Sequence, residues 1–326
     1  MASAASSPAS VDAAILEGAR RLIPPLTASG HKGQNGKVGV LGGCREYTGA
    51  PYFAGIAAVK VGADLSHVFC TPGAAPTIKG YSPELIVLPF LPDESSPLDP
   101  QGSAKLVSQI KAWLGRIGCL VVGPGLGDDP GVVAVSRTVL REARAAGLPL
   151  LVDGSGLNFV AQDPDLIRGY DRCIVTPNLV EFGRLAGGLG LELDGAIGPQ
   201  WQEQTQQLAA ALDGPIVVSK GPADVISDGA TTAACSLPAS LRRAGGQGDL
   251  VAGSIAAFMC WAFPRRGGGG VDGGDGRRAL MHAAYGGCAV VRAASARAFA
   301  ERRRSMLAGD IIPHLQGAFE EVFPDA

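Results

Sequence analysis

The sequence predicts an α/β protein with a doubly wound, mostly parallel sheet flanked by helices. Its 326 residues are 46% hydrophobic, which is enough apolar material for a substantial core. Short apolar runs rich in Val, Ile and Leu recur without strict alternation of apolar and polar positions, as expected for strands covered on both faces. Helical patterns lie between these runs, and such alternation indicates right-handed βαβ units.

The expected strands follow one another in the first three quarters of the chain. They are KVGVLGG (37–43), LSHVFC (65–70), ELIVLPF (84–90), CLVVG (119–123), PLLVDG (149–154), CIVTP (173–177), PIVVSK (215–220) and ADVISD (223–228). The last two are joined by a short turn, which predicts a hairpin-like unit. Glycine clusters at the ends of the runs and forms no repeat.

The expected helices fill the intervals and the C-terminal part. They are PYFAGIAAVKVGAD (51–64), VVAVSRTVLREARAAG (132–147), WQEQTQQLAAALDG (201–214), SIAAFMCWAF (254–263) and a region from about 278 to 300. Pro at the start of the first of these suits a first helical position, and Gly at the end of the second is a normal stop.

We expect a single catalytic domain over residues 12–326, preceded by a disordered tail at residues 1–11. The run RRGGGGVDGGDGRR (265–278) is of low complexity, and it predicts a disordered surface insertion between two helices. No other stretch has the composition of a linker, so nothing marks a second domain boundary.

Composition excludes several classes of partner. The formal net charge is −2, and no like-charged block is longer than RRR at 302–304, so we expect no nucleic-acid partner. No apolar segment reaches membrane-spanning length, so we expect no membrane association. Seven cysteines are scattered without a CxxC pair, which favours a reducing compartment and a cytoplasmic location. The N-terminal segment lacks a signal-peptide core and has no arginine before Arg20, and a mitochondrial address remains the alternative.

Ligands in such a sheet bind at the carboxyl ends of the strands, where three glycine-rich turns occur. The first, GPGLGDD (123–129), has Asp128 where a dinucleotide fingerprint needs its third glycine. Either it contacts an anion or it is only a tight strand-to-helix turn. Gly36-Lys37 does not form a P-loop, because His31 and Val38 replace the glycine and the hydroxyl residue that this motif requires.

The second turn, AGGQGDLVAGSIAAF (244–258), leads into a strongly helical segment. The N–H groups of Gly246, Gln247 and Gly248 would line the helix N-terminus, a geometry that suits a phosphate. Asp249 falls in the first turn of that helix. It is either a dipole partner or cap, or a general base beside an anion hole, which is what phosphoryl transfer to a hydroxyl requires.

The third turn lies in SKGPADVISDG (219–229) and could hold a nucleotide from one side. Here Lys220 is either a ligand or an exposed lysine at a strand end. His31, Lys32 and Tyr47 either line a site or form a surface entry to the sheet, and His67 is interpreted as a core residue. No HExxH or GxSxG motif is present, which argues against zinc and serine hydrolases.

Six motifs together resemble a known family. HKGQNGKVGVLGG, EYTGAPYFA, VGPGLG, TPNLVEFGRL, KGPAD and GGQGDLVAG occur in the order found in ATP- or ADP-dependent NAD(P)H-hydrate dehydratases. The resemblance covers roughly residues 12–318 and implies a ribokinase-like fold with Rossmann-type layers. With Gln247 at its centre, the GGQGD segment resembles that of the eukaryotic branch of the family, which uses ATP.

The resemblance implies a repair reaction on damaged nicotinamide nucleotides. Water added to the ring of NADH or NADPH leaves a hydroxyl, and the enzyme phosphorylates the S form of this hydrate with ATP. Phosphate then leaves and the reduced dinucleotide is restored. The resemblance also implies Mg²⁺ bridging the phosphates, with protein ligands that the sequence does not identify.

The resemblance assigns two sets of residues. Contacts to the hydrated dinucleotide are expected from Gly125, Asn178, Leu179, Val180, Glu181, Phe182, Gly183, Arg184 and Asp249, of which Asp249 is the expected catalytic base. Contacts to ATP are expected from Lys220, Gly221, Pro222, Ala223, Asp224, Ala239, Ser240, Leu241, Arg242, Arg243, Ala244, Gly245, Gly246, Gln247 and Gly248. One departure is Ser155 in VDGSGL, where an acid is often found, although Asp153 remains.

Two other functions stay open at this point. A small-molecule kinase of the same superfamily, acting on a vitamin precursor or sugar, would leave a stable phosphorylated product. A non-catalytic nucleotide-binding protein would have no need for Asp249. The sequence also leaves the oligomeric state open, with a homo-oligomer among the outcomes.

Overall fold

The computed structural model describes residues 8–92, 99–193, 197–264 and 276–324. Within them one continuous nine-stranded sheet has the order β3-β2-β1-β4-β5-β6-β7-β8-β9. The strands are β1 (Lys37–Leu41), β2 (Leu65–Phe69), β3 (Leu85–Leu88), β4 (Cys119–Val122), β5 (Leu150–Val152), β6 (Cys173–Val175), β7 (Ile216–Ser219), β8 (Asp224–Ser227) and β9 (Thr232–Cys235). The pairs from β3 to β7 are parallel, and β8 and β9 are antiparallel to their neighbours.

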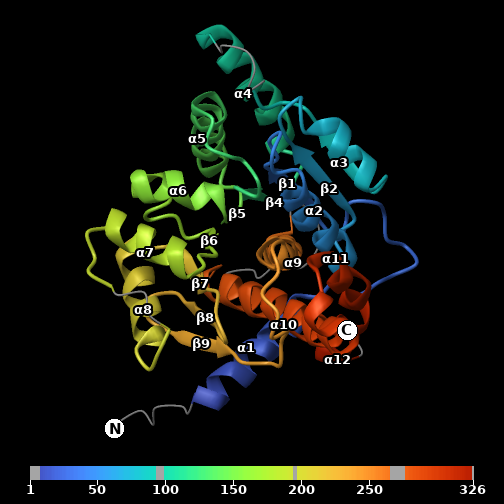
Figure 1. Ribbon diagram of the computed structural model, residues 1–326, viewed down its shortest axis with the longest axis vertical. Coiled ribbons are helices and arrows are strands. Elements are labelled where there is room, and N and C mark those ends of the chain that lie inside the picture. The colour runs from blue at the N-terminus through green and yellow to red at the C-terminus, as the bar shows by residue number, and fades with distance from the viewer. Residues whose placement is uncertain (1–7, 93–98, 194–196, 265–275, 325–326) are drawn as a thin grey trace.

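Helices cover both faces of the sheet, as the sequence predicts for a doubly wound fold (Figure 1). One face packs against α4 (Pro100–Leu114), α5 (Pro130–Ala145), α6 (Ser155–Gln162), α7 (Leu179–Gly188) and α8 (Trp201–Leu212). The other packs against α1 (Pro8–Leu22), α2 (Gly49–Val61), α3 (Ala75–Tyr81), α9 (Gln247–Ala262), α10 (Gly276–Arg302), α11 (Ala308–Ile311) and α12 (Leu315–Val322). Short 3₁₀ turns are η1 (Pro164–Leu166), η2 (Arg303–Ser305) and η3 (Ile312–His314).

The central strands are buried on both faces, which explains their unbroken apolar runs. Every residue of β4, β5, β6, β7 and β8 is buried. The order of the strands reverses between β1 and β4, since the chain first moves outward through β2 and β3 and then returns. Such a switch point is where ligands bind in sheets of this kind.

The structure confirms the eight predicted strands and the β7–β8 hairpin, and it adds a ninth strand. β9 has the sequence TAAC, whose two alanines give a weak strand signal. It forms through pairing with β8 and through α1, where Asp12 Oδ1 accepts a hydrogen bond of 3.0 Å from the Ala234 amide. Contacts from distant parts of the chain therefore produce this strand.

Two predicted disordered segments differ in part from the structure. The tail expected at residues 1–11 is helical from Pro8, because α1 packs its buried Ile15 and Ala19 into the core that contains α10. Of the glycine-rich insertion expected at 265–278, residues 276–278 are the first turn of α10. Residues 1–7 and 265–275 lie outside the described residues. No helix among those described is both long and apolar enough to cross a membrane.

Candidate active site

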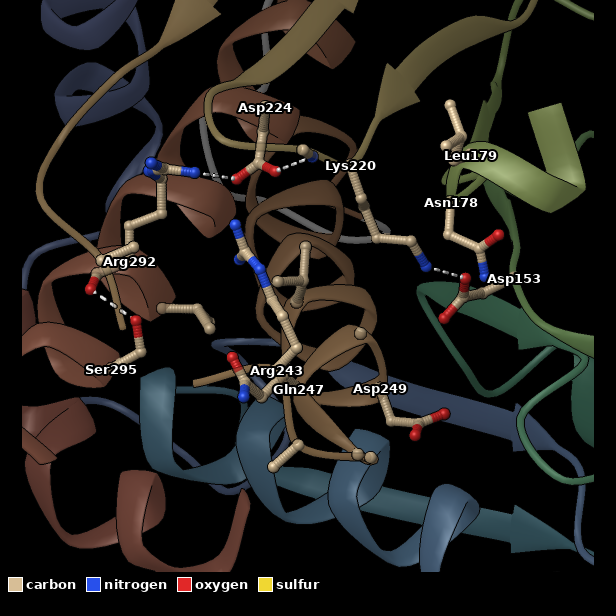
Figure 2. A pocket seen from close by; sticks show the side chains of 18 of the residues that line it. Asp153, Asn178, Leu179, Lys220, Asp224, Arg243, Gln247, Asp249, Arg292 and Ser295 are labelled. Carbon is tan, nitrogen blue, oxygen red and sulfur yellow. Dashed lines mark hydrogen bonds and ion pairs between the residues drawn. The ribbon is translucent and has the colours of Figure 1, made fainter. Parts of the chain in front are cut away.

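The carboxyl ends of the parallel strands meet at one edge of the sheet, and polar or glycine residues follow several of them. Asp153 and Gly154 follow β5, Asn178 comes shortly after β6, and Lys220 follows β7. The N-terminus of α9 approaches the same edge and closes a pocket of about 540 Å³. Figure 2 shows the labelled side chains of Asp153, Asn178, Lys220 and Asp249 around this pocket.

The structure brings most of the predicted site residues to this pocket. Those lining it are Asn178, Leu179, Glu181, Lys220, Gly221, Pro222, Asp224, Ala239, Arg243, Ala244, Gly245, Gly246, Gln247, Gly248 and Asp249. Residues that line it without having been predicted are Asp153, Gly154, Ile197, Val251, Val291, Arg292 and Ser295. Residues from the expected dinucleotide set and from the expected ATP set therefore line the same cavity.

The glycine-rich GGQGD segment, which we call the cradle, leads into the N-terminus of α9, as the sequence predicts. Gly246 is the N-cap of α9 with φ +93°, and a Cβ there would lie 2.7 Å from the Phe53 ring, so both backbone and space require glycine. The first amides of α9 have no acceptor within the helix, and Gln247, Gly248 and Asp249 line the pocket. The Gln247 side chain donates to the Arg242 carbonyl at 2.9 Å and fixes the preceding loop.

Lys220 is not an exposed strand-end lysine. Its Nζ lies 2.6 Å from Asp153 Oδ1, and the two side chains are only 17% and 3% exposed. The ammonium also lies over the cradle, since a Cβ on Gly248 would be 3.1 Å from Nζ. Burial alone would lower the pKa of Lys220, but attraction by Asp153 and Glu181 outweighs it and raises that pKa.

Asp249 borders the pocket in the first turn of α9 and does not occupy the cap position, which belongs to Gly246. Burial of its carboxyl, together with repulsion by Asp153, raises the pKa of Asp249 to about 7, although Lys220 acts in the opposite direction. A carboxylate whose pKa lies near neutrality is suited to general-base catalysis. The structure excludes the cap position for Asp249, and its role as a base stays a prediction.

The segment after β6 combines a helix cap with pocket lining. Asn178 Oδ1 accepts hydrogen bonds from the amides of Val180 and Glu181, at 2.9 and 3.0 Å, and Glu181 Oε2 accepts one from the Asn178 amide at 2.8 Å. This capping box starts α7 and holds both polar side chains at the pocket. Burial raises the pKa of Glu181, opposed by the nearby Lys220.

Four of the residues expected to touch the dinucleotide do not line the pocket, because α7 turns them away. Phe182 is fully buried and packs on Trp201, with ring centroids 4.8 Å apart, so it is a core residue. Arg184 Nη1 donates to Asn158 Oδ1 at 3.0 Å. Val180 is 60% exposed outside the pocket, and Gly183 faces open space.

Gly125 also lies outside the pocket, in the neighbouring turn after β4. Its φ is +63°, and a Cβ would lie 2.4 Å from the Tyr47 carbonyl, so the turn requires glycine for close packing. Its carbonyl accepts a hydrogen bond of 3.1 Å from the Gly43 amide and joins the turns after β1 and β4. Gly125 therefore shapes the switch point next to the pocket.

Part of the expected ATP segment faces away from the pocket as well. Leu241 is 83% exposed, and Ser240 is buried with its Oγ accepting a hydrogen bond of 2.9 Å from the Arg242 amide. Arg242 Nε donates to the Met306 carbonyl at 3.1 Å, away from the cavity. Together with Ala223, these residues lie behind the pocket wall and do not line it.

The remaining candidate residues lie in different parts of the fold. His31 and Lys32 precede β1 in a loop that Asp64 fixes by accepting bonds from the Gly33 and Asn35 amides, at 2.7 and 3.0 Å. They lie at the amino edge of the sheet, opposite the pocket. Tyr47 lies at the carboxyl edge and is exposed. His67 is buried with its ring centroid 5.1 Å from that of Trp113, which confirms a core residue.

Three carboxylates border the pocket near Lys220. No group of three or more His, Cys, Asp or Glu side chains with metal-binding geometry occurs in the part of the chain that the structure describes. Asp153, Glu181 and Asp249 nevertheless lie close enough to influence one another. Mg²⁺ usually binds proteins through one or two carboxylates together with substrate phosphates and water, so it does not require a larger group of protein ligands.

Comparison with known proteins agrees with this geometry. The family described as NAD(P)H-hydrate dehydratase matches residues 38–316. The ATP-dependent (S)-NAD(P)H-hydrate dehydratase of Bos taurus is 46% identical over 310 residues, which cover 95% of this chain and 89% of the relative. The Homo sapiens protein of the same name is 42% identical over 308 residues, with 93% and 83% covered.

Solved structures share the fold. The ADP/ATP-dependent NAD(P)H-hydrate dehydratase from Bacillus subtilis, co-crystallised with ATP/Mg²⁺, superposes with a TM-score of 0.65 at 21% identity and covers 94% of this chain and 97% of its own. A ribokinase-like superfamily protein from Enterococcus faecalis gives 0.69 at 21% identity, with 95% of each chain covered. With the family match and these identities, the chain belongs to the NAD(P)H-hydrate dehydratase family.

Proposed function

We propose that this protein repairs hydrated nicotinamide nucleotides in an ATP-dependent dehydration. It converts the S form of hydrated NADH and NADPH to NADH and NADPH and releases ADP and phosphate, which makes it a carbon–oxygen lyase. The observation that supports this most strongly is the union, in one pocket, of the α9 cradle, Lys220 and a carboxyl group of Asp249 with a pKa of about 7.

Phosphoryl transfer comes first. Asp249 accepts the proton of the hydroxyl on the hydrated ring, and the hydroxyl oxygen forms a bond to the γ-phosphorus of ATP while the bond to ADP breaks. In this step the amides of Gln247 and Gly248 and the nearby ammonium of Lys220 stabilise the negative charge that develops on the transferred group. Asp153 holds Lys220 in this position through the 2.6 Å ion pair.

Elimination follows from the phosphorylated ring. The carbon–oxygen bond breaks, phosphate takes the bonding electrons, and a proton is lost from the adjacent carbon as the ring double bond re-forms. Phosphate is a far better leaving group than hydroxide, so this step needs little additional catalysis. One ATP is therefore consumed for each reduced nicotinamide restored.

The two substrates are proposed to meet at Asp249. ATP lies along residues 220–224 and 239–248, and the hydrated dinucleotide lies against Asn178, Leu179 and Glu181, reaching toward the turn at Gly125. Asp153 and Glu181 would hold Mg²⁺, directly or through water, beside the phosphates. When bound, this ion neutralises charge on the transferred phosphoryl group.

Phosphate release tests the proposal. With ATP and Mg²⁺, hydrated NADH should stimulate release of free phosphate, and the reduced-nicotinamide absorbance should return. A small-molecule kinase of this superfamily would instead leave a stable phosphorylated product, and ATP consumption without restored absorbance would contradict the dehydratase. A non-catalytic nucleotide-binding protein would release no phosphate at all. A cytoplasmic location, a homo-oligomer and the absence of a nucleic-acid partner stay predictions.

A further inference from the structure

The two walls of the proposed ATP pocket come from separate parts of the chain. One wall is the β7–β8 turn at residues 220–224, and the other is the segment 239–248 that leads into α9. Strands β8 and β9 lie between them along the chain. An ATP pocket needs a fixed distance between these walls, and contacts from α10 set this distance.

Arg292, in α10, contacts the first wall and the end of the strand that leads to the second. Its guanidinium pairs with Asp224 Oδ2 at 3.2 Å and donates to the Pro222 carbonyl, and its Nε donates to the Leu237 carbonyl at 2.8 Å. Asp224 Oδ1 in turn accepts the Gly221 amide at 3.2 Å and closes the turn. Arg292 thus holds the β7–β8 turn and the β9 exit to the same helix. Figure 2 shows its ion pair with Asp224.

Ser295, one helical turn later, holds the backbone behind the second wall. Its Oγ accepts the Ser240 amide at 3.1 Å and donates to the Arg292 carbonyl at 2.8 Å. Arg292 and Ser295 are only 7% and 3% exposed, yet both border the pocket next to the apolar Val291. We call Arg292 and Ser295 the α10 clamp.

The clamp lies at the end of the pocket away from the chemistry. The cradle, Lys220 and Asp249 form the phosphate end, whereas Pro222, Ala239 and Val291 border the region beside the clamp. A nucleotide with its phosphates at the cradle would place its ribose and base there. Arginine suits this role because its planar group presents five donors in fixed directions and here reaches three different acceptors.

We propose that the α10 clamp is a positioning device for the nucleoside end of ATP, with Arg292 as its main residue. It contacts no reacting atom and acts by fixing the separation of the two walls. The inference rests on the proposed function, because the two walls are assigned to ATP. A purely structural role would change stability and leave the relative affinities of the two substrates unchanged.

Binding of ADP tests the inference without any turnover. Arg292→Lys keeps a charge for Asp224 but cannot reach all three acceptors, and we expect calorimetry to show ADP affinity weakened about 10- to 100-fold. The KM for ATP should rise in parallel, while the KM for hydrated NADH stays within about 2-fold of wild type. ADP affinity equal to wild type in folded Arg292→Lys would overturn the inference.

Ser295→Ala provides the second variant, since it removes one hydroxyl and leaves the buried ion pair intact. Its ADP affinity should fall by less than that of Arg292→Lys, about 3- to 10-fold. Should Arg292→Lys fail to fold, unchanged ADP affinity in Ser295→Ala would still refute the clamp. The matched control is Arg297→Lys, whose arginine lies on the same helix but pairs with Glu321 at 2.6 Å, and it should bind ADP normally.

The same data separate this inference from the proposed function. Wild-type protein that binds ADP but never restores hydrated NADH would contradict the dehydratase while the clamp could still be measured. Restored NADH together with unchanged ADP affinity in both clamp variants would contradict the clamp alone.

Discussion

Two buried ion pairs stand at opposite ends of the same pocket, and they differ in charge balance. Lys220–Asp153, at the phosphate end, has two further carboxylates nearby, Glu181 and Asp249, so three acids share one lysine. Arg292–Asp224, at the other end, is one cation with one anion. The remaining hydrogen bonds of Arg292 go to backbone carbonyls, and Asp224 also accepts one from a backbone amide. The excess of acid helps to raise the pKa of Asp249, which suits its proposed role as a base, whereas the balanced pair is suited to holding the walls of the pocket.

The largest effect is expected from Asp249→Asn. The amide keeps the shape of the carboxyl but cannot accept the hydroxyl proton, so turnover should fall by about 100-fold or more. Nucleotide binding should remain, because the cradle is backbone. Steady-state kinetics with hydrated NADH and ADP calorimetry check both parts, and a fully active variant would refute the assignment of the base.

Breaking the Arg292–Asp224 pair should lower the affinity for ATP and leave the pH dependence of turnover in place. Asp224→Asn removes the charge that Arg292 pairs with at 3.2 Å, and we expect ATP affinity to fall by about 10-fold. The pH dependence of turnover should keep its position, since Asp224 is not among the charges that shift the pKa of Asp249. A pH profile displaced in this variant would contradict the separation of the two pairs.

Breaking the Lys220–Asp153 pair should shift the pH dependence of turnover. The base works only when deprotonated, and the pKa of Asp249 is about 7, so turnover of the wild type should fall as the pH drops through that value. Asp153→Asn removes the repulsion that helps to raise this pKa, and the acid limb should therefore move to lower pH. Turnover measured over a pH series gives the position of the acid limb. An acid limb at the same pH as in the wild type would show that Asp153 does not raise the pKa of the base.

The smallest effect concerns stability. A carboxyl whose pKa rises on folding loses its proton more readily in the unfolded state, so stability falls between about pH 4 and pH 7. The Asp249→Asn variant has no buried carboxyl group to ionise at this position. Its thermal unfolding temperature at pH 8 should therefore be about 2 °C or more above that of the wild type. The difference should vanish below about pH 4, and its absence at pH 8 would argue against a buried, ionised Asp249.

The sequence predicted the pocket residues at the N-terminus of α9 better than those in α10, and the reason is local. Gly246, Gly248 and Asp249 are adjacent in the chain, and a glycine turn before an apolar helical run already predicts a helix N-terminus with an acid beside it. Arg292 is far along the chain from Asp224, inside a helix of small residues. The available signal was an arginine in the run GCAVVRAAS, on a helix otherwise apolar enough to be buried.

The expected dinucleotide contacts that do not line the pocket have the opposite cause, and their contact with the substrate stays a prediction. In PNLVEFGR, consecutive positions share a motif but not a face, because a helix turns by 100° at each residue. Asn178, Leu179 and Glu181 face the pocket, whereas Phe182 packs into the core on Trp201. A motif therefore identifies the segment, and only the three-dimensional placement of the helix shows which of its side chains contact a ligand.

The measurement that tests the central claim most directly is the stoichiometry of repair. Wild-type protein with ATP, Mg²⁺ and hydrated NADH should produce ADP, free phosphate and restored NADH in equal amounts, and Asp249→Asn should produce none of the three at a comparable rate. ADP formed in excess of NADH, with the phosphoryl group retained on a stable product, would contradict the account.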